Sequence, residues 1–329
     1  MRWASLICLF GKEVPVLSIE IKEVQLKNYG KCLSMNNGKL NLLVTIDVGP
    51  RIIWFGPDGG PNLLYQDNAD LYTEQGEAFD KAFGPGSCYH LYGGHRLWLA
   101  PEQIPESYYP DNEPVIYSLL PDGVRFTPPC QRPSEIQLSL EIMMAPQAQD
   151  VMILHAGQNC SDKKRQFALW GITAMAPGGT LYVPQNPEKD TLLANRAFAF
   201  WPYSHINDDR FYMGDRYITL QQNQVQGAGK NSNRFKVGCN NFAGWCAYVN
   251  QGMVFTKRYV HNKDVRYTDF GCSFEAYVDD NLLEIETFSP LYHVEPQETI
   301  KHVENWSVFP APGPRPAPRD EDAIAQYFA

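Results

Sequence analysis

The 329-residue sequence has no run of more than three basic residues, and its formal net charge is −9. Proteins that bind nucleic acid need clustered lysine and arginine to contact phosphates, so nucleic acid is not expected as the main partner. The eight cysteines include no Cys-x-x-Cys pair, the spacing typical of zinc and redox motifs. They are scattered as reduced core thiols would be, and their even number does not predict disulfides.

Long apolar segments and several enzyme motifs are also missing. Residues 1–10 hold an apolar stretch that is too short to cross a membrane and that lacks a convincing signal-peptide cleavage site. The glycines of residues 56–60 lack the lysine and the following helix of a phosphate-binding loop, and no Gly-x-Ser-x-Gly element is present. We therefore expect a cytoplasmic protein with no membrane partner.

The composition favours a globular protein built from strands. Hydrophobic residues make up 44% of the chain and charged residues only 20%, so a large core can be buried. Aromatic residues reach 13%, and the 25 glycines and 25 prolines favour short strands joined by frequent turns. The sequence thus predicts an all-β fold.

Apolar alternation interrupted by turn residues predicts four antiparallel hairpins. In two of them the strands are residues 40–48 with 51–55 and residues 137–145 with 151–158. The other two hairpins each lie within one segment, residues 244–259 and residues 272–287. A helix is expected within 69–83, although Gly76 disfavours it. Residues 184–212 are rich in Asn, Pro and Trp and are expected to form a long loop across a sheet face.

Three segments are expected along the chain. Residues 1–38 form a lead-in, residues 39–309 form one β domain, and residues 310–329 form a proline-rich tail. Alternating prolines prevent sheet pairing, so the tail should be extended. We expect it to wrap its own domain rather than bind a partner, with 320–329 either docking as a short helix or fraying.

Residues 88–102 combine side chains that suit a sugar. Trp98 and Tyr92 offer apolar faces to the C–H side of a pyranose, and Arg96 and Glu102 can bond its hydroxyls. The alternative is a strand-turn-strand corner with a core tryptophan. The density of polar groups favours the sugar site.

The same segment holds His90 and His95, either of which could transfer a proton near neutral pH. Together with Glu102 they could instead hold a divalent ion, but the helical histidine pair of zinc proteases is missing. We expect no metal and no cofactor.

Several motifs occur in an order that resembles the galactose mutarotase-like superfamily, and in particular an uncharacterised bacterial branch of it. They are Gly49-Pro50-Arg51-Ile52, Asn62-Leu63-Leu64, Gly93-Gly94-His95-Arg96-Leu97-Trp98, Glu284-Ile285-Glu286-Thr287 and Pro296-Gln297-Glu298-Thr299. The resemblance covers approximately residues 39–308. It implies a large antiparallel β-supersandwich with one sugar pocket.

The resemblance to aldose 1-epimerases also implies catalytic roles. Glu286 matches the general base, and Arg51 with His90 or His95 matches the early pocket residues. Strand alternation puts Glu284 on the same face as Glu286, so one of them is expected to be an ion-pair partner. The central strand 167–173 lacks the histidine that supplies the acid in that family.

The missing acid leaves His95, His90 and His205 as candidates, and the sugar-binding aspartate could be Asp208, Asp209 or Asp269. Other residues expected to complete the groove are Trp201, Tyr203, Asp209, Arg210, Lys236, Asp269 and Glu275. A cluster of Arg51, Arg96 and Lys236 could accept a phosphate or uronate.

The sequence therefore predicts a carbohydrate-binding protein whose partner is a small sugar or an oligosaccharide. As an enzyme it would interconvert sugar anomers by general acid/base ring opening, with Glu286 as base. The alternative is a binding module without turnover, or a glycoside-active enzyme that uses Glu102 with Glu286. The oligomeric state is left open.

Overall fold

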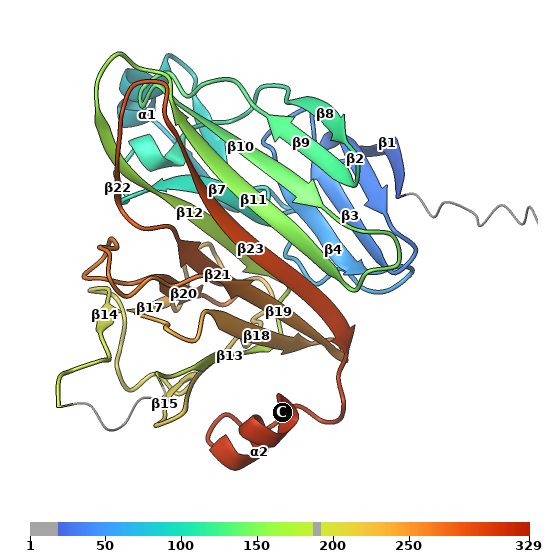
Figure 1. Cartoon of the computed structure of the whole chain (residues 1–329), viewed down its shortest axis with the longest axis vertical. Coiled ribbons are helices and arrows are strands. Elements are labelled where there is room, and N and C mark those ends of the chain that lie inside the picture. The colour runs from blue at the N-terminus through green and yellow to red at the C-terminus, as the bar shows by residue number, and fades with distance from the viewer. Residues whose placement is uncertain (1–18, 187–191) are drawn as a thin grey trace, which may run out of the picture.

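Two large antiparallel sheets stack to form the molecule, as Figure 1 shows. This computed structural model describes residues 19–186 and 192–329. Each strand pair in the two sheets is antiparallel and strand residues far outnumber helical ones, so the predicted all-β sandwich is confirmed.

The first sheet has eleven strands. Their spatial order is β1 (Glu20–Leu26), β2 (Gly30–Asn36), β3 (Leu40–Thr45), β4 (Ile52–Pro57), β7 (His95–Ala100), β12 (Arg165–Met175), β21 (Leu283–Phe288), β20 (Phe274–Val278), β17 (Phe235–Cys239) and β14 (Phe198–Phe200), with β22 (Tyr292–Val294) paired to β12.

The second sheet has ten strands. Their order is β15 (Phe211–Met213), β16 (Tyr217–Gln221), β13 (Thr180–Pro184), β18 (Trp245–Asn250), β19 (Met253–Tyr259), β23 (Thr299–Pro310), β11 (Asp150–Asn159), β10 (Ile136–Met143), β9 (Gly123–Thr127) and β8 (Ile116–Leu120). A separate pair is formed by β5 (Thr73–Gln75) and β6 (Cys88–His90), and the helices are α1 (Glu77–Phe83), the short 3-10 helix η1 (Glu106–Tyr108) and α2 (Glu321–Tyr327).

The main core lies between the two sheets. Successive strand residues face opposite sides, so one face of β12 contributes Phe167 and Leu169 to this core. The opposite face of the same strand contributes Trp170 and Ile172 to a second, aromatic-rich cluster. Both faces of the central strands of the first sheet are therefore buried.

All four predicted hairpins are confirmed by the strand pairing. The pairs are β3 with β4, β10 with β11, β18 with β19, and β20 with β21. Gly94, which precedes β7, has a φ of +65°, and a Cβ there would lie 2.1 Å from the carbonyl oxygen of Ile52. Only glycine allows this approach of β7 to β4.

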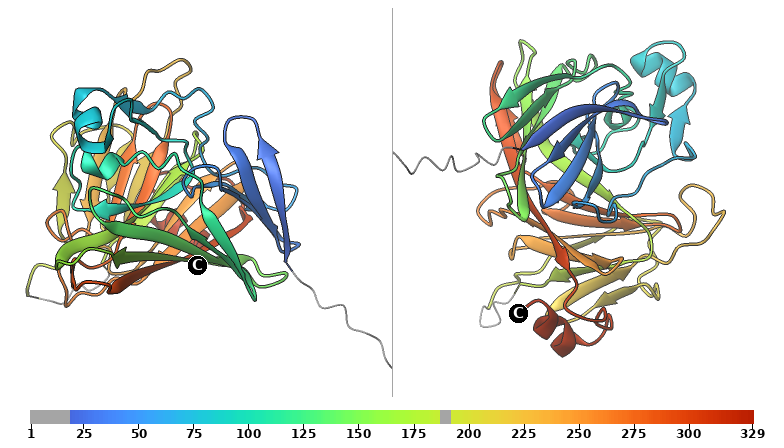
Figure 2. Two further views of the ribbon diagram at one scale, coloured as in Figure 1. Left: turned by 90° about the horizontal axis from the view of Figure 1, so that it is seen from above. Right: turned by 90° about the vertical axis from the view of Figure 1, so that its right-hand side faces the viewer.

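The sheet begins earlier in the chain than expected. Residues 20–36, which we expected to precede the domain, form β1 and β2 at one edge of the first sheet. Figure 2 shows this hairpin on the opposite side of the molecule from α1. The rest of the expected lead-in, residues 1–18, lies outside the described residues.

The segment expected to hold a helix is divided between two kinds of structure. Its first half contains the strand β5, and only Glu77–Phe83 is helical. Gly76 lies at the N-terminal cap with a φ of +120°, so the glycine that disfavours a longer helix marks its start. The expected long loop 184–212 includes the short strands β14 and β15, and its residues 187–191 lie outside the described part of the chain.

The proline-rich tail packs on the outer face of the second sheet. Pro310 still pairs in β23, but the next residues leave the sheet. The Tyr182 hydroxyl donates a hydrogen bond to the Pro316 carbonyl, and Ile324 of α2 is fully buried beside Val249 and Val254. The tail thus ends in a docked short helix, which was one of the two alternatives predicted for residues 320–329.

The cysteines of the described residues are all free thiols. Those at 32, 239, 246 and 272 are buried, as the sequence predicted. Cys88 and Cys130 are half-buried and Cys160 is exposed, so these three are not core residues. Cys8 lies outside the described residues.

No helix in the described chain has the length and apolar character that a membrane crossing requires.

Candidate functional site

A pocket of about 330 Å³ opens on the outer face of the first sheet. Its floor comes from neighbouring strands: β7 supplies Arg96 and Trp98, β12 supplies Trp170, and β21 supplies Glu284 and Glu286. Eight aromatic side chains line it: Tyr72, Tyr89, Trp98, Tyr108, Trp170, Trp201, Tyr203 and Tyr277. This volume and lining are typical of small-molecule sites.

Arg96 is the cation at one side of the pocket floor. Its Nη1 donates a hydrogen bond of 2.9 Å to Glu284 Oε1, and its guanidinium lies 4.5 Å from the ring centre of Trp98. Burial by itself lowers the pKa of Arg96, but Glu284 more than reverses this and raises it. The charge of Arg96 is therefore neutralised within the protein.

Lys236 is the cation at the other side and is held by two carboxylates. Its Nζ lies 2.7 Å from Glu275 Oε2 and 2.9 Å from Glu286 Oε2, and Glu286 also accepts a bond from Trp170 Nε1. The ammonium lies 4.5 Å from the ring centre of Trp201. Lys236, Glu275 and Glu286 are all buried, so this arrangement is rigid.

Burial and charge shift the pKa values of these three groups in the same direction. Burial raises the pKa of Glu286 and, more strongly, that of Glu275, against the opposing effect of Lys236. Burial alone would lower the pKa of Lys236, but its two carboxylate partners raise it well above its usual value. Lys236 is thus a firmly charged hydrogen-bond donor and a weak acid.

The pocket mouth is formed by two segments outside the large sheets, residues 101–108 and residues 229–234. Residues 101–108 contribute Glu102, Ile104 and Tyr108, and the Tyr108 hydroxyl donates a bond of 3.0 Å to Glu102. On the other side Arg234 lies over the ring of Tyr203, 4.2 Å from its centre. Polar groups thus surround an aromatic interior.

Half of the predicted site residues meet in this pocket. The lining includes Glu286, Arg96, Trp98, Glu102, Trp201, Tyr203 and Lys236. Glu275 pairs with Lys236, and its Oε1 atom is buried without a hydrogen-bond partner. Their roles in binding or catalysis stay predictions.

His95, predicted as an acid, lies on the wrong face of the sheet. Because alternate residues of β7 face opposite sides, Arg96 faces the pocket and His95 points into the core between the sheets. Its side chain is fully buried and bonds Thr173 and His155. It cannot reach a molecule in the pocket.

His90 also lies outside the pocket lining. Its neighbours Tyr89 and Leu91 line the pocket, whereas the His90 Nδ1 pairs with Asp70 at 2.7 Å and its ring lies against Tyr92. Alternation again explains the difference. Tyr92 itself is not among the lining residues.

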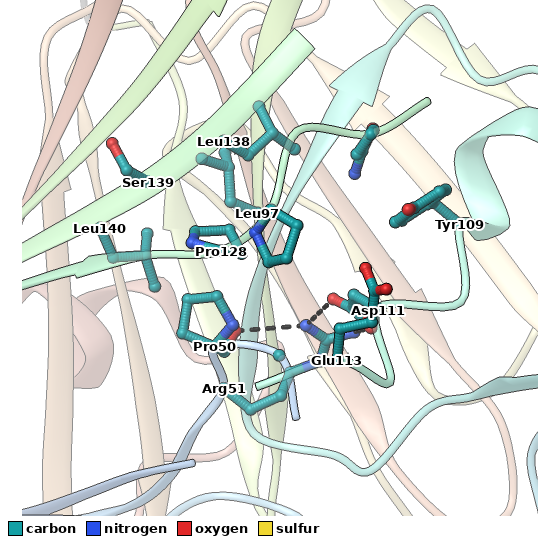
Figure 3. A pocket seen from close by; sticks show the side chains of 13 residues that line it. Pro50, Arg51, Leu97, Tyr109, Asp111, Glu113, Pro128, Leu138, Ser139 and Leu140 are labelled. Atoms are coloured by element: carbon teal, nitrogen blue, oxygen red, sulfur yellow. Dashed lines mark hydrogen bonds and ion pairs between the residues drawn. The ribbon is translucent and has the colours of Figure 1, made fainter. Parts of the chain in front are cut away.

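Arg51 is elsewhere in the molecule and is already paired. Figure 3 shows it pointing toward Asp111, with which its guanidinium forms bonds of 2.5 and 2.9 Å. The small cavity beside this pair has a volume of about 20 Å³, room for about one water molecule. The predicted cluster of Arg51 with Arg96 and Lys236 is therefore wrong.

The remaining predicted residues do not reach the pocket either. Arg210 is buried and forms an ion pair with Asp208, 2.7 Å long. Asp209 and His205 are exposed in turns outside the lining, and Asp269 lies in a turn with a φ of +48°. All three aspartates thus lie in turn segments outside the pocket lining.

His95 belongs to a buried polar network behind the pocket. The His155 Nδ1 must donate to the His302 carbonyl, so its Nε2 accepts the bond of 2.8 Å from His95 Nε2. The His95 Nδ1 then accepts from Thr173 Oγ1, which itself accepts from Lys257 Nζ at 2.6 Å. This chain of bonds requires both imidazoles to be neutral, and burial lowers the pKa of each.

The network also contains a buried ion pair. Lys257 Nζ lies 3.1 Å from Glu304 Oε1, which accepts a further bond from Thr287, while Trp306 Nε1 donates to Glu304 Oε2. Burial acts against ionisation of Glu304, but Lys257 holds its pKa below the usual value.

Three of these residues could be read as metal ligands. Ligand atoms of His95, His155 and Glu304 lie within 4.8 Å of one another. Their lone pairs are already engaged within the network, and the Lys257 ammonium beside Glu304 would repel a cation. The arrangement therefore fits a closed hydrogen-bond network better than a metal site.

A second cavity of about 410 Å³ lies beyond the segment 101–108. Its two cations, Lys164 and Arg165, pair with Glu295 and Glu135, and its lining has one aromatic side chain, Phe167. The aromatic pocket is the better candidate for function.

Sequence reasoning missed several lining residues. They are Tyr72, Glu74, Tyr89, Leu91, Ile104, Tyr108, Trp170, Ile172, Asn231, Arg234, Tyr277 and Leu282. Tyr277 could have been found, because it lies two residues from the predicted Glu275 on a predicted strand and therefore faces the same side. The loop residues carry no such signal.

Comparison with solved structures identifies the fold. A galactose mutarotase-like protein from Clostridium acetobutylicum aligns over 89% of this chain and 99% of its own length, with a TM-score of 0.52 and 10% identity. One from Lactobacillus casei aligns over 84% of this chain and its full length, with a TM-score of 0.50 and 10% identity.

A TPR-domain containing protein from Parabacteroides distasonis is similar over 92% of this chain, with a TM-score of 0.56 and 13% identity. This chain spans only 57% of that protein's length. No protein-family model matches the chain, and no curated protein sequence does. The two stacked antiparallel sheets and these structural neighbours together show that the chain has the galactose mutarotase-like fold.

Proposed function

We propose that the chain binds a carbohydrate in the aromatic pocket and does not turn it over. The observation that carries this proposal is the combination of three tryptophans, Trp98, Trp170 and Trp201, with internally paired charges in one concave site.

Such a lining suits a sugar on physical grounds. Tryptophan faces pack against the C–H surface of a pyranose, and the paired charges offer strong donors and acceptors to its hydroxyls. Because Arg96 and Glu284 neutralise each other, a ligand need not supply a counter-charge there. The fold neighbours named galactose mutarotase-like also favour a sugar.

Turnover is less well supported by the same residues. Anomer exchange needs a base for the anomeric hydroxyl and an acid for the ring oxygen. None of the described residues lining the pocket is a histidine. Glu286 accepts hydrogen bonds from Lys236 and Trp170. The carboxylate partners of Lys236 raise its pKa, and burial raises the pKa of the Tyr203 hydroxyl, so neither group is a ready proton donor.

The first experiment is an NMR screen of the full chain with neutral aldoses, sugar acids and sugar phosphates. Saturation transfer reports binding, and exchange between anomer signals reports catalysis in the same sample. We expect binding without accelerated exchange. Silence for every sugar would contradict the proposal.

A loop tryptophan provides the matched variant. Trp201→Ala removes a half-buried wall of the pocket and should weaken sugar binding about 3- to 10-fold, since an aromatic contact contributes about 0.5–1.5 kcal/mol beyond burial. Trp54→Ala removes a half-buried tryptophan of β4 outside the pocket and should leave the dissociation constant unchanged.

The second candidate function is anomer exchange with Glu286 as base. The observation that favours it is that Glu286 lines the pocket and that burial raises its pKa, which makes it a stronger base. If the screen detects accelerated exchange, Glu286→Gln should abolish it while sugar binding is largely kept.

A further inference from the structure

Arg234 differs from the other cations of the pocket. Arg96 and Lys236 have carboxylate partners, but no ion pair or hydrogen bond engages the Arg234 guanidinium in the described chain. It is held by stacking on the ring of Tyr203. Its N–H donors and its charge are therefore available at the mouth.

The segment that carries Arg234 is firmly braced. Arg210 Nη2 donates a bond of 2.6 Å to the Asn233 carbonyl, and the Ser232 hydroxyl bonds Asp280 at 3.0 Å. Lys230 Nζ bonds the Thr73 carbonyl at 2.6 Å. A ligand at Arg234 would thus meet a segment that is already ordered, so little ordering entropy is lost on binding.

Asn231 adds a second donor on the same side of the mouth. Its Oδ1 accepts a bond of 3.1 Å from Tyr277, and its backbone N–H bonds Asp279. The first contact fixes the side chain and the second fixes the backbone, and the Nδ2 group is left without an acceptor among the described residues. Asn231 lines the pocket together with Arg234.

We propose that the ligand is a sugar acid with a single carboxylate, a uronate, whose ring lies in the aromatic pocket and whose carboxylate binds Arg234 and Asn231. A guanidinium presents parallel N–H groups that match the two oxygens of a carboxylate. This inference rests on the proposed sugar binding and adds the charge of the ligand.

The surrounding charges favour a carboxylate over a phosphate. Glu74, Glu102, Glu284 and Glu286 also line the pocket, and Arg234 is its one cation without a carboxylate partner in the described chain. A phosphate group carries about −1.5 to −2 charges at neutral pH and would leave part of that charge unbalanced. One guanidinium balances one carboxylate.

Calorimetric titration of the full chain should compare glucuronate and galacturonate with glucose, galactose and glucose 6-phosphate. We expect a uronate to bind at least about tenfold more tightly than its neutral counterpart, because a hydrogen-bonded charge pair is being formed. Tighter binding of the phosphate than of the uronates would overturn the carboxylate assignment.

Two variants at Arg234 test the contact itself. Arg234→Gln should remove the preference for uronates, so that a uronate and its neutral counterpart bind with similar dissociation constants, and Arg234→Lys should retain only part of the preference, since a lysine lacks the two-pronged geometry. Arg319→Gln is the matched control, because Arg319 is an exposed arginine stacked on Tyr212 outside the pocket lining.

The failures of the two proposals can be told apart. Equal binding of neutral and acidic sugars, unaffected by Arg234→Gln, would overturn the uronate inference and leave sugar binding standing. Binding of none of these sugars would overturn both.

Discussion

Lys257 shows how this protein keeps a charge in its interior. The side chain is fully buried, yet its ammonium donates to Thr173, to the Ile285 carbonyl and to Glu304, which uses all three of its N–H groups. A buried charge is tolerated only when it is paired and hydrogen-bonded. Removing one partner should therefore cost far more than the pair contributes.

Lys257→Met leaves the Glu304 carboxylate buried without its counter-ion. We expect the free energy of unfolding to fall by about 3–5 kcal/mol, measured by urea denaturation. The double variant with Glu304→Gln should recover part of the loss, because no charge is then left unpaired. Lys301→Met, at an exposed position of β23, is the control and should change little.

His261 makes the free energy of unfolding depend on pH. Burial lowers its pKa to about 4, from an ordinary value of 6.5. The unfolded chain therefore binds a proton between these values that the native state does not. The contribution of His261 to stability is complete above about pH 6.5 and declines as the pH falls toward 4.

The test compares the native chain with His261→Phe. The variant should lose less unfolding free energy between pH 7 and pH 5, and the His261 ring proton should titrate near pH 4 by NMR. A midpoint near 6.5 would contradict the assignment.

Single residues also show where sequence reasoning succeeds and where it stops. Arg96 and Trp98 line the pocket as expected, but the neighbouring His95 does not. Successive strand residues face opposite sides of the sheet, so His95 faces away from Arg96 and Trp98. Because both faces of this sheet are buried, the sequence alone does not show which face holds the pocket. Glu286 could be placed because its motif is matched as a unit.

At the scale of elements, β12 of the first sheet packs against β11 and β23 of the second sheet, around the buried network. A Cβ at Gly171 would lie 2.7 Å from Glu304 Oε1 and 3.4 Å from His155 Nε2. Glu304 is held by its own bonds and cannot move away. Glycine at this position is therefore required by space and not by backbone conformation.

Gly171→Ala should lower the free energy of unfolding by about 1–3 kcal/mol through overpacking. Gly313→Ala is the matched control, because a Cβ there has no atom within 4 Å. Equal stability of the two variants would show that the network can shift to make room.

Elements differ in how well the sequence predicts them. The four hairpins were predicted because their alternation and turn residues are local signals. The segments 101–108 and 229–234, which form the pocket mouth, have no periodic pattern, and their positions depend on contacts with distant strands. The N-terminal strand β1 was missed because it is an edge strand with many exposed residues. Its neighbour β2 is mostly buried and pairs on both sides, but its short apolar run lacks the strict alternation that marks a strand in sequence.

At the scale of the whole molecule, the tail and the pocket are on different sheets. The tail covers the outer face of the second sheet, and the pocket opens on the outer face of the first. They should therefore respond independently to substitution. The cytoplasmic location predicted from the sequence stays a prediction.

Ile324→Ala should loosen the tail without affecting sugar binding. Loss of a fully buried side chain from a small cluster costs about 2 kcal/mol or more, so trypsin should cleave faster after Arg319, the tail arginine that is not followed by proline. Gln326→Ala, at an exposed position of α2, should leave cleavage unchanged. Altered sugar affinity in the Ile324 variant would reveal coupling between the sheets.

The two buried faces of the central strands have a practical consequence for protein engineering. On β7, β12 and β21 the pocket takes even-numbered residues such as Arg96, Trp170 and Glu286, and the network takes odd-numbered ones such as Thr173 and Thr287. Residues that line the pocket and residues that form the buried network thus alternate along the same strands. A mutant library that randomises only the even positions would vary the residues that line the pocket and leave the buried network at the odd positions unchanged.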